Sequence, residues 1–157
     1  MDALHTLLEQ AQAERNLALA AFSQNRARFD AARAQATQLD AYRADYERRW
    51  SAQFAQGAAL QIVRCYQDFS QRLETAIAQQ GLAVAQARSA VAQAGDALTA
   101  NELRVASVRK LIERRAQAER RMLERHERKA DDEAAIRVAL ARGGNALSGT
   151  GGKICPT

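Results

Sequence analysis

The chain has 157 residues, of which 47% are hydrophobic but only 5% are aromatic, so a thick globular core is excluded. Its one proline, Pro156, leaves every earlier residue free to be helical. The formal net charge of +5 arises in the last third, where residues 104–157 carry thirteen basic and seven acidic side chains. These properties favour long helices and an acidic partner for the basic end.

The sequence also bears on where the protein works. It contains no run of about 18 apolar residues, so no membrane-spanning helix is predicted. The first ten residues include Asp2 and Glu9 and do not resemble a secretory signal. Two cysteines, Cys65 and Cys155, do not suggest a disulfide framework. We therefore expect a cytoplasmic protein.

The first predicted element is a helix over about residues 2–54. A mainly apolar stripe follows it in alternating steps of four and three residues, as in a coiled coil. The stripe consists of Leu4, Leu8, Ala11, Arg15, Ala18, Phe22, Asn25, Phe29, Ala32, Ala36, Leu39, Arg43, Tyr46 and Trp50. Its polar members weaken such a seam but can fix its register.

A turn is expected at about residues 55–60, because Gly57 is the only glycine in the first 80 residues and tolerates the left-handed backbone of a helix end. A short turn between two helices with matching stripes makes an antiparallel hairpin. If the turn is centred near residue 57, Tyr46 is expected to meet Tyr66 or Phe69.

The second predicted helix covers about residues 60–142 and carries the most regular pattern in the chain. Its seam consists of Val63, Tyr66, Ser70, Leu73, Ile77, Gln80, Val84, Ala87, Val91, Ala94, Leu98, Asn101, Val105, Val108 and Ile112. A period of about 3.5 residues over this length is typical of a coiled-coil seam. The seam ends near the residue where the first helix can no longer reach it. We therefore expect the second helix to overhang the first.

The overhang, from about Arg114 to Arg142, is rich in arginine and glutamate at the i,i+3 and i,i+4 spacings that support a helix. Gly143 and Gly144 are expected to end it, and residues 143–157 are expected to be disordered. The predicted fold class is therefore all-α: one long antiparallel two-helix coiled-coil hairpin of residues 1–142, which we expect to be monomeric.

No catalytic, cofactor or metal site emerges from the sequence. His5 and His126 are far apart in the predicted hairpin, and a two-helix rod offers no enclosed pocket. The segment Gly151-Gly152-Lys153 lacks the first glycine and the Ser or Thr of a phosphate-binding loop. We expect that the protein is not an enzyme and needs no cofactor or metal.

The basic overhang admits three interpretations. Nucleic acid would bind its arginines through phosphates. Interspersed acids such as Glu119, Glu124 and Glu127 argue against that interpretation and favour a protein groove or ring. A helix that is merely solvated is the remaining alternative.

Two rows of residues near the predicted turn are candidates for a docking surface. Leu39, Tyr46, Leu73 and Gln80 lie on the two stripes, so packing within the hairpin explains them well. Their neighbours Gln35, Tyr42, Phe69 and Ala76 flank the stripes and are expected to be partly exposed.

Several blocks resemble the flagellar export protein family FliJ. They are LDAYRADY at residues 39–46, Gly57, YQDF and LETAIAQQ within residues 66–80, and LERHERKADDE at residues 123–133. The resemblance covers nearly the whole chain up to about Arg142. It implies a hairpin similar to the stalk subunit of rotary ATPases, placed in the hexameric ATPase ring of the bacterial flagellar type III export apparatus.

The resemblance also implies partners. These are the export ATPase hexamer, the membrane export gate and the export chaperones, with the protein bound peripherally at the inner membrane. The gate contact is implied for Gln35, Leu39, Tyr42, Tyr46, Phe69, Leu73, Ala76 and Gln80. The ring contact is expected from Arg114, Arg115, Arg120, Arg121, Arg125, Arg128 and Lys129. The equivalent stalk of a virulence secretion system and a basic nucleic-acid adaptor are the alternatives.

Overall fold

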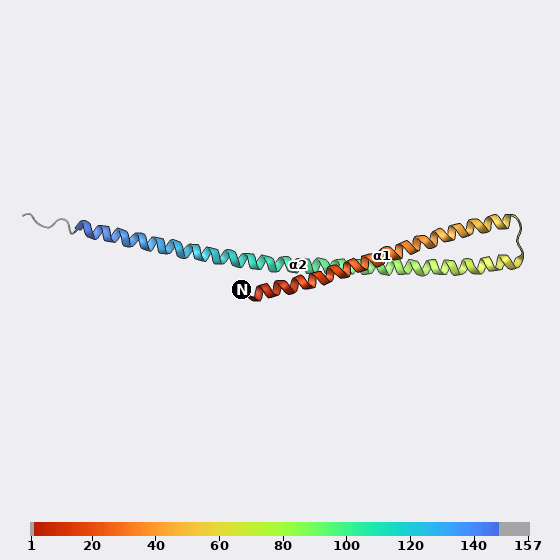
Figure 1. Ribbon diagram of the computed structural model, residues 1–157, viewed down its shortest axis with the longest axis horizontal. Helices are drawn as coiled ribbons and strands as arrows, with labels where there is room; N and C mark the ends of the chain where they lie inside the picture. Colours follow the sequence, from red (N-terminus) through yellow and green to blue (C-terminus); the bar gives the residue numbers. More distant parts are fainter. Residues whose placement is uncertain (1, 148–157) are drawn as a thin grey trace, which may run out of the picture. The chain divides into compact units, whose positions relative to one another are not determined.

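A computed structural model describes residues 2–147, which form two helices, α1 (Asp2–Ala55) and α2 (Leu60–Leu147). From the turn that joins them, α1 and the first part of α2 extend to the same side with opposite chain directions (Figure 1). With 88 residues, α2 is much longer than α1, which has 54. The described part contains no strand, so the predicted all-α antiparallel hairpin is confirmed.

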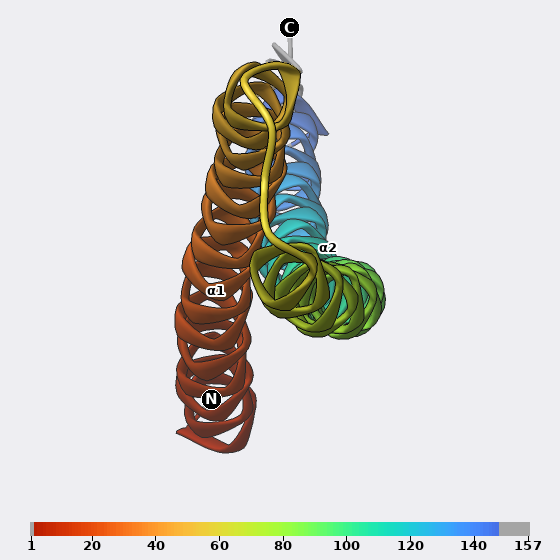
Figure 2. The ribbon, with the colours of Figure 1, turned by 90° about the vertical axis from the view of Figure 1, so that its right-hand side faces the viewer.

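The turn lies where the sequence predicts it. Gly57 has a φ of +90°, a left-handed conformation that side chains with a Cβ atom rarely adopt. Its N–H donates to the carbonyl oxygen of Phe54 at 3.1 Å and so closes the end of α1. The carbonyl oxygen of Ala59 accepts from the N–H groups of Ile62 and Val63, which begins α2. Viewed from this end, the connection runs directly from one helix to the other (Figure 2).

The two stripes predicted from the sequence form the interface between the helices. All fourteen stripe positions of α1 and all fifteen seam positions of α2 are buried or half-buried. The most buried are Ala11, Leu73, Val105 and Val108, at 2%, 7%, 4% and 5% exposure. Because each helix covers the other on one side only, the core is a single line of side chains.

Contacts between the helices fix the antiparallel register. Near the turn the rings of Tyr46 and Tyr66 stack with their centroids 5.6 Å apart, as predicted. Far from the turn Arg104 Nη1 donates to Glu14 Oε2 at 2.8 Å. Between these points Phe22 lies against Gly95, where an added Cβ would sit 3.4 Å from the phenylalanine ring. The ring of Phe22 thus packs in van der Waals range of the Gly95 backbone.

The end of α2 differs from the prediction. The helix does not stop at Gly143 but continues through both glycines to Leu147. In the described part only Gly57 has a positive φ, so neither Gly143 nor Gly144 takes the left-handed conformation of a helix end. A glycine can also stay within a helix, at a cost of only about 1 kcal/mol relative to alanine. The predicted disorder of residues 148–157 falls outside the residues that the structure describes.

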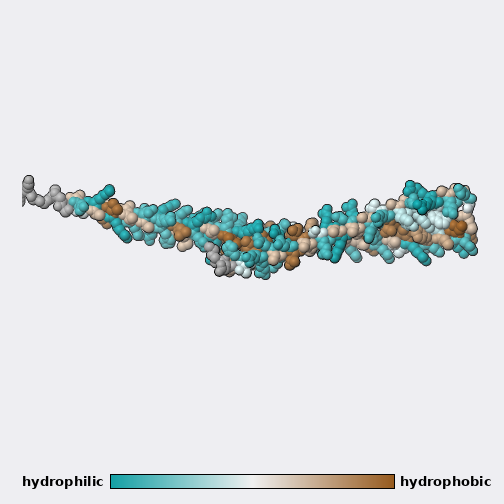
Figure 3. Space-filling view, viewed as in Figure 1, coloured by the Kyte–Doolittle hydropathy of each residue, from teal (hydrophilic) through white to brown (hydrophobic). Residues whose placement is uncertain are grey.

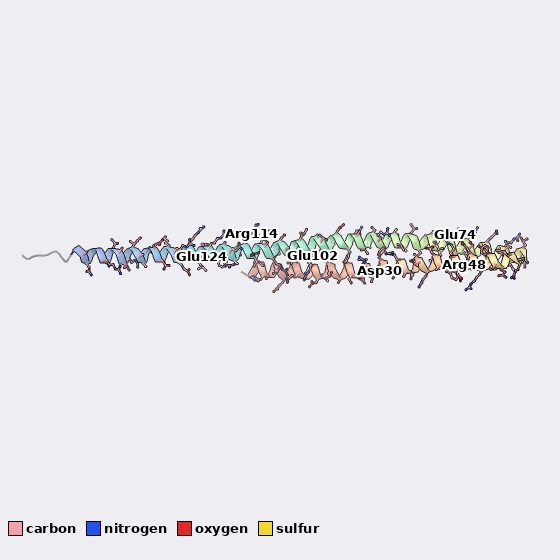
Figure 4. All side chains as sticks on the ribbon, turned by 90° about the horizontal axis from the view of Figure 1, so that it is seen from above. Asp30, Arg48, Glu74, Glu102, Arg114 and Glu124 are labelled. Carbon is pink, nitrogen blue, oxygen red and sulfur yellow. The ribbon has the colours of Figure 1, made fainter. Side chains whose placement is uncertain are left out.

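The chain divides into two compact units, one ending at Val108 and the other beginning at Arg109. We call residues 2–108 the hairpin and residues 109–147, which continue α2, the distal helix. In the distal helix Ile112 is half-buried and every side chain from residue 113 to residue 146 is exposed. Its surface is mainly hydrophilic with separate hydrophobic patches (Figure 3). Charged side chains extend from both units, as the labelled residues illustrate (Figure 4).

We predict that Leu73→Ala lowers the free energy of unfolding by about 2–3 kcal/mol, because it removes a nearly buried side chain from the seam. Leu82→Ala is the matched control, since Leu82 lies on the same helix but is 67% exposed. We expect it to change stability by no more than about 0.5 kcal/mol. Urea unfolding followed by circular dichroism measures both; equal effects would contradict a core confined to the seam.

Candidate functional site

Six aromatic side chains form a continuous cluster across the two helices next to the turn. They are Tyr42, Tyr46, Trp50 and Phe54 of α1 and Tyr66 and Phe69 of α2. The four members from α1 recur every fourth residue, which places them along one side of the helix. The closest rings, those of Tyr46 and Phe69, have centroids 4.5 Å apart. Such aromatic pairs add to the stability gained from burial alone.

One side of this cluster faces solvent. Tyr42 is 51% exposed and Phe69 is 36% exposed, and their rings meet edge to face at 6.3 Å. Tyr46, Trp50 and Tyr66 are half-buried, because they lie on the stripes that face the other helix. The cluster therefore holds the hairpin together through its stripe residues and presents Tyr42 and Phe69 to a partner.

A pair of glutamines continues this surface away from the turn. The half-buried amide of Gln80 donates from Nε2 to the carbonyl oxygen of Ala32 at 3.0 Å and to Gln35 Oε1 at 3.2 Å. These bonds hold Gln80 and Gln35 side by side across the two helices. A shallow hollow beside them is lined by Gln35, Gln38, Leu39, Tyr42 and Gln80.

The structure brings together most of the eight residues that the resemblance implies for the gate contact. Four of them line the hollow, and Tyr46 and Phe69 join Tyr42 through ring contacts. Leu73 is buried in the seam, so its side chain supports the surface from below. Ala76 is half-buried and lines a different hollow together with Asp68 and Arg72.

These exposed and half-buried side chains form one surface, which we call the Tyr42 surface. It consists of Gln35, Gln38, Leu39, Tyr42, Phe69 and Gln80. Gln38 is the member that the sequence analysis missed. The available signal was its spacing, since it lies three residues after Gln35 and four before Tyr42 and so shares their side of α1.

The seven basic residues expected to contact an ATPase ring are all exposed on the distal helix. At about 100° per residue, Arg114, Arg121, Arg125 and Arg128 fall within roughly 60° of arc. Arg120 points away from this arc. The structure therefore gathers part of the predicted set on one side and leaves the rest spread around the helix.

Other kinds of site find little support among the residues that the structure describes. No three His, Cys, Asp or Glu side chains group as a metal site there. Cys65 is free and exposed. Neither α1 nor α2 is long and apolar enough to cross a membrane.

Comparison with known proteins decides the family. The family described as "Flagellar FliJ protein" matches residues 1–144. The chain belongs to the FliJ family. No curated protein and no solved structure matches the chain. Membership confirms the resemblance seen in the sequence blocks and implies a flagellar, export-associated function in a family that is a non-catalytic component of export.

We predict that Tyr46→Ala lowers the free energy of unfolding by about 2 kcal/mol, because the ring contacts Tyr42, Trp50, Tyr66 and Phe69. Tyr42→Ala removes a half-exposed ring and should cost about 1 kcal/mol or less. Urea unfolding measures both variants. A larger loss for Tyr42→Ala than for Tyr46→Ala would show that Tyr42 belongs to the core and not to a docking surface.

Proposed function

We propose that this FliJ-family protein is the stalk of the flagellar type III export apparatus. Its distal helix enters the ring of the export ATPase, and its Tyr42 surface binds the membrane export gate. The change in burial along α2 carries the proposal, because Val108 is 5% exposed whereas every side chain from residue 113 to residue 146 is exposed. In proteins most helical stability comes from tertiary packing, which this exposed stretch lacks, so a surrounding partner would stabilise it.

A ring is a suitable partner for such a helix because its central opening can receive a helix that is exposed on all sides. Basic side chains are present on more than one side of the distal helix, as Arg114 and Arg120 illustrate. The family description names the flagellum, which favours the flagellar apparatus over a virulence secretion system. Export chaperones and a peripheral position at the inner membrane belong to the same proposal.

The Tyr42 surface supports the second contact. It combines exposed aromatic area from Tyr42 and Phe69 with the amides of Gln35 and Gln80. Aromatic side chains on rigid elements are typical anchors of protein interfaces, and nearby amides add specificity through hydrogen bonds. Both helices contribute to this surface, so a gate bound there would recognise only the folded hairpin.

We predict that a chain ending at Arg114 keeps a folded hairpin but loses binding to the cognate export ATPase. The hairpin survives because the truncated chain retains every nearly buried seam residue through Val108. Co-elution with the ATPase hexamer measures binding, and circular dichroism measures folding. A chain ending at Leu147 is the control, since it keeps the whole distal helix, and it should bind normally. Binding retained by the shorter chain would sink the stalk assignment.

We predict that Tyr42→Ala combined with Phe69→Ala weakens binding to the export gate by about tenfold or more, as expected when two interface anchors are removed. Helix content should stay unchanged. Leu17→Ala with Leu82→Ala is the control, because both leucines are exposed elsewhere on the hairpin, at 73% and 67%. Isothermal titration with the soluble part of the gate measures the affinities. Equal weakening by the control would contradict a localised gate contact.

A further inference from the structure

The distal helix carries a row of exposed apolar side chains. Leu111, Met122, Ile136 and Leu140 are 50%, 58%, 59% and 70% exposed. At about 100° per residue these four side chains fall within roughly 40° of arc, and Ala118 and the charged Lys129 fall in the same arc. Large apolar side chains aligned on one side of an exposed helix are typical of a helix that docks into a groove.

This row is distinct from the seam of the hairpin. The seam residues closest to it, Val105 and Val108, are 4% and 5% exposed, whereas Leu111 is half exposed only three residues later. Within the distal helix the row lies roughly a quarter turn to one side of the half-buried Ile112. The row is therefore not explained by packing against α1.

A stripe of positive charge runs beside the first half of the row. Lys110, Arg114, Arg121, Arg125 and Arg128 are all exposed and fall within about 60° of arc next to it. Four acidic residues of the distal helix lie in another arc, on the far side of the basic stripe from the apolar row. They are Glu113, Glu124, Glu127 and Asp131. The basic stripe thus lies between this acidic group and the apolar row. Arg109, Arg120 and Arg142 share the acidic arc, and Glu119 lies on the other side of the row.

We infer that the apolar row and the basic stripe together form one docking face, which binds a protein groove with an apolar floor and an acidic rim. The inference rests on the proposed function, because it assigns the face of the distal helix that meets the ATPase ring and the chemistry of the ring surface there. Complementary charge at the rim orients such a helix, and burial of Leu111, Met122, Ile136 and Leu140 supplies affinity.

Two acidic residues argue for a protein over a nucleic acid or a lipid surface. Asp132 and Glu133 lie on either side of the apolar row, between Met122 and Ile136, and both are exposed. Phosphates of DNA or of an anionic membrane would repel them along the same face. A protein groove can place a basic or neutral residue opposite each of them.

The first test replaces apolar side chains at equal exposure on two sides of the helix. Met122→Gln with Ile136→Gln changes the docking face, whereas Leu123→Gln with Val138→Gln changes side chains of similar exposure, 62% and 52%, outside it. Fluorescence anisotropy with the cognate ATPase hexamer measures affinity. We expect at least a tenfold loss for the first pair and less than a threefold loss for the second.

The second test compares the loss of positive charge on the docking face with an equal loss on other sides of the helix. The first triple variant changes Arg114, Arg121 and Arg125 to Gln and so removes three charges from the basic stripe. The control triple changes Arg109, Arg120 and Arg142 to Gln and removes three charges from other sides of the helix. We expect only the first triple to weaken ATPase binding and to reduce its dependence on salt, because only those charges face the acidic rim. Circular dichroism verifies that both triples keep their helix content.

The outcomes separate this inference from the stalk proposal. If the unchanged chain binds the ATPase but the face and control variants lose affinity equally, the docking face is wrong and the stalk stands. If the unchanged chain does not bind, both fail. A 20-base-pair duplex and phosphatidylglycerol vesicles serve as further probes. The inferred protein groove would be wrong if the basic-stripe triple weakened binding to the duplex or to the vesicles but left the affinity for the ATPase unchanged.

Discussion

The hairpin depends on one geometric constraint: two helices can bury apolar surface only along the line where they touch. This line supplies few strongly buried residues, among them Leu73, Val105 and Val108. Ion pairs add little, because the side chains of Arg104 and Glu14 remain 55% and 37% exposed although their charged atoms lie 2.8 Å apart. Stability is therefore spread over many half-buried side chains, and off-seam positions remain available for partners without cost to the fold.

The sequence predicts this architecture well because burial in a two-helix rod depends mainly on which side of each helix faces the other. Periodicity alone identifies both stripes, and Gly57 alone identifies the turn. The details that escape prediction depend on side-chain conformation and on the axial offset between the helices. They include the packing of Phe22 on Gly95 and the donation from Gln80 to the carbonyl oxygen of Ala32. The end of α2 escaped because a glycine permits a helix end but does not require one.

The sequence also predicts the candidate surfaces only in part. The family resemblance identifies Tyr42 and Phe69, and the seam explains why these two are exposed while Tyr46 is half-buried. The apolar row of the distal helix escaped because steps of about 3.5 residues suit a supercoiled pair, whereas an unpaired helix keeps about 3.6 residues per turn. Leu111 and Ile136 align on one side of the helix only at about 3.6 residues per turn.

The position of the aromatic cluster beside the turn has a consequence for how the hairpin forms. Tyr46 and Tyr66 are close in sequence, whereas the residues of the Gln80–Ala32 and Arg104–Glu14 contacts are separated by 48 and 90 positions. Closing a loop becomes costlier as it lengthens, by roughly 0.6 kcal/mol per doubling. The aromatic rings thus meet where chain entropy opposes them least. We expect folding to begin there and to proceed along the seam, and the first turns of α1 to open first when the hairpin unfolds.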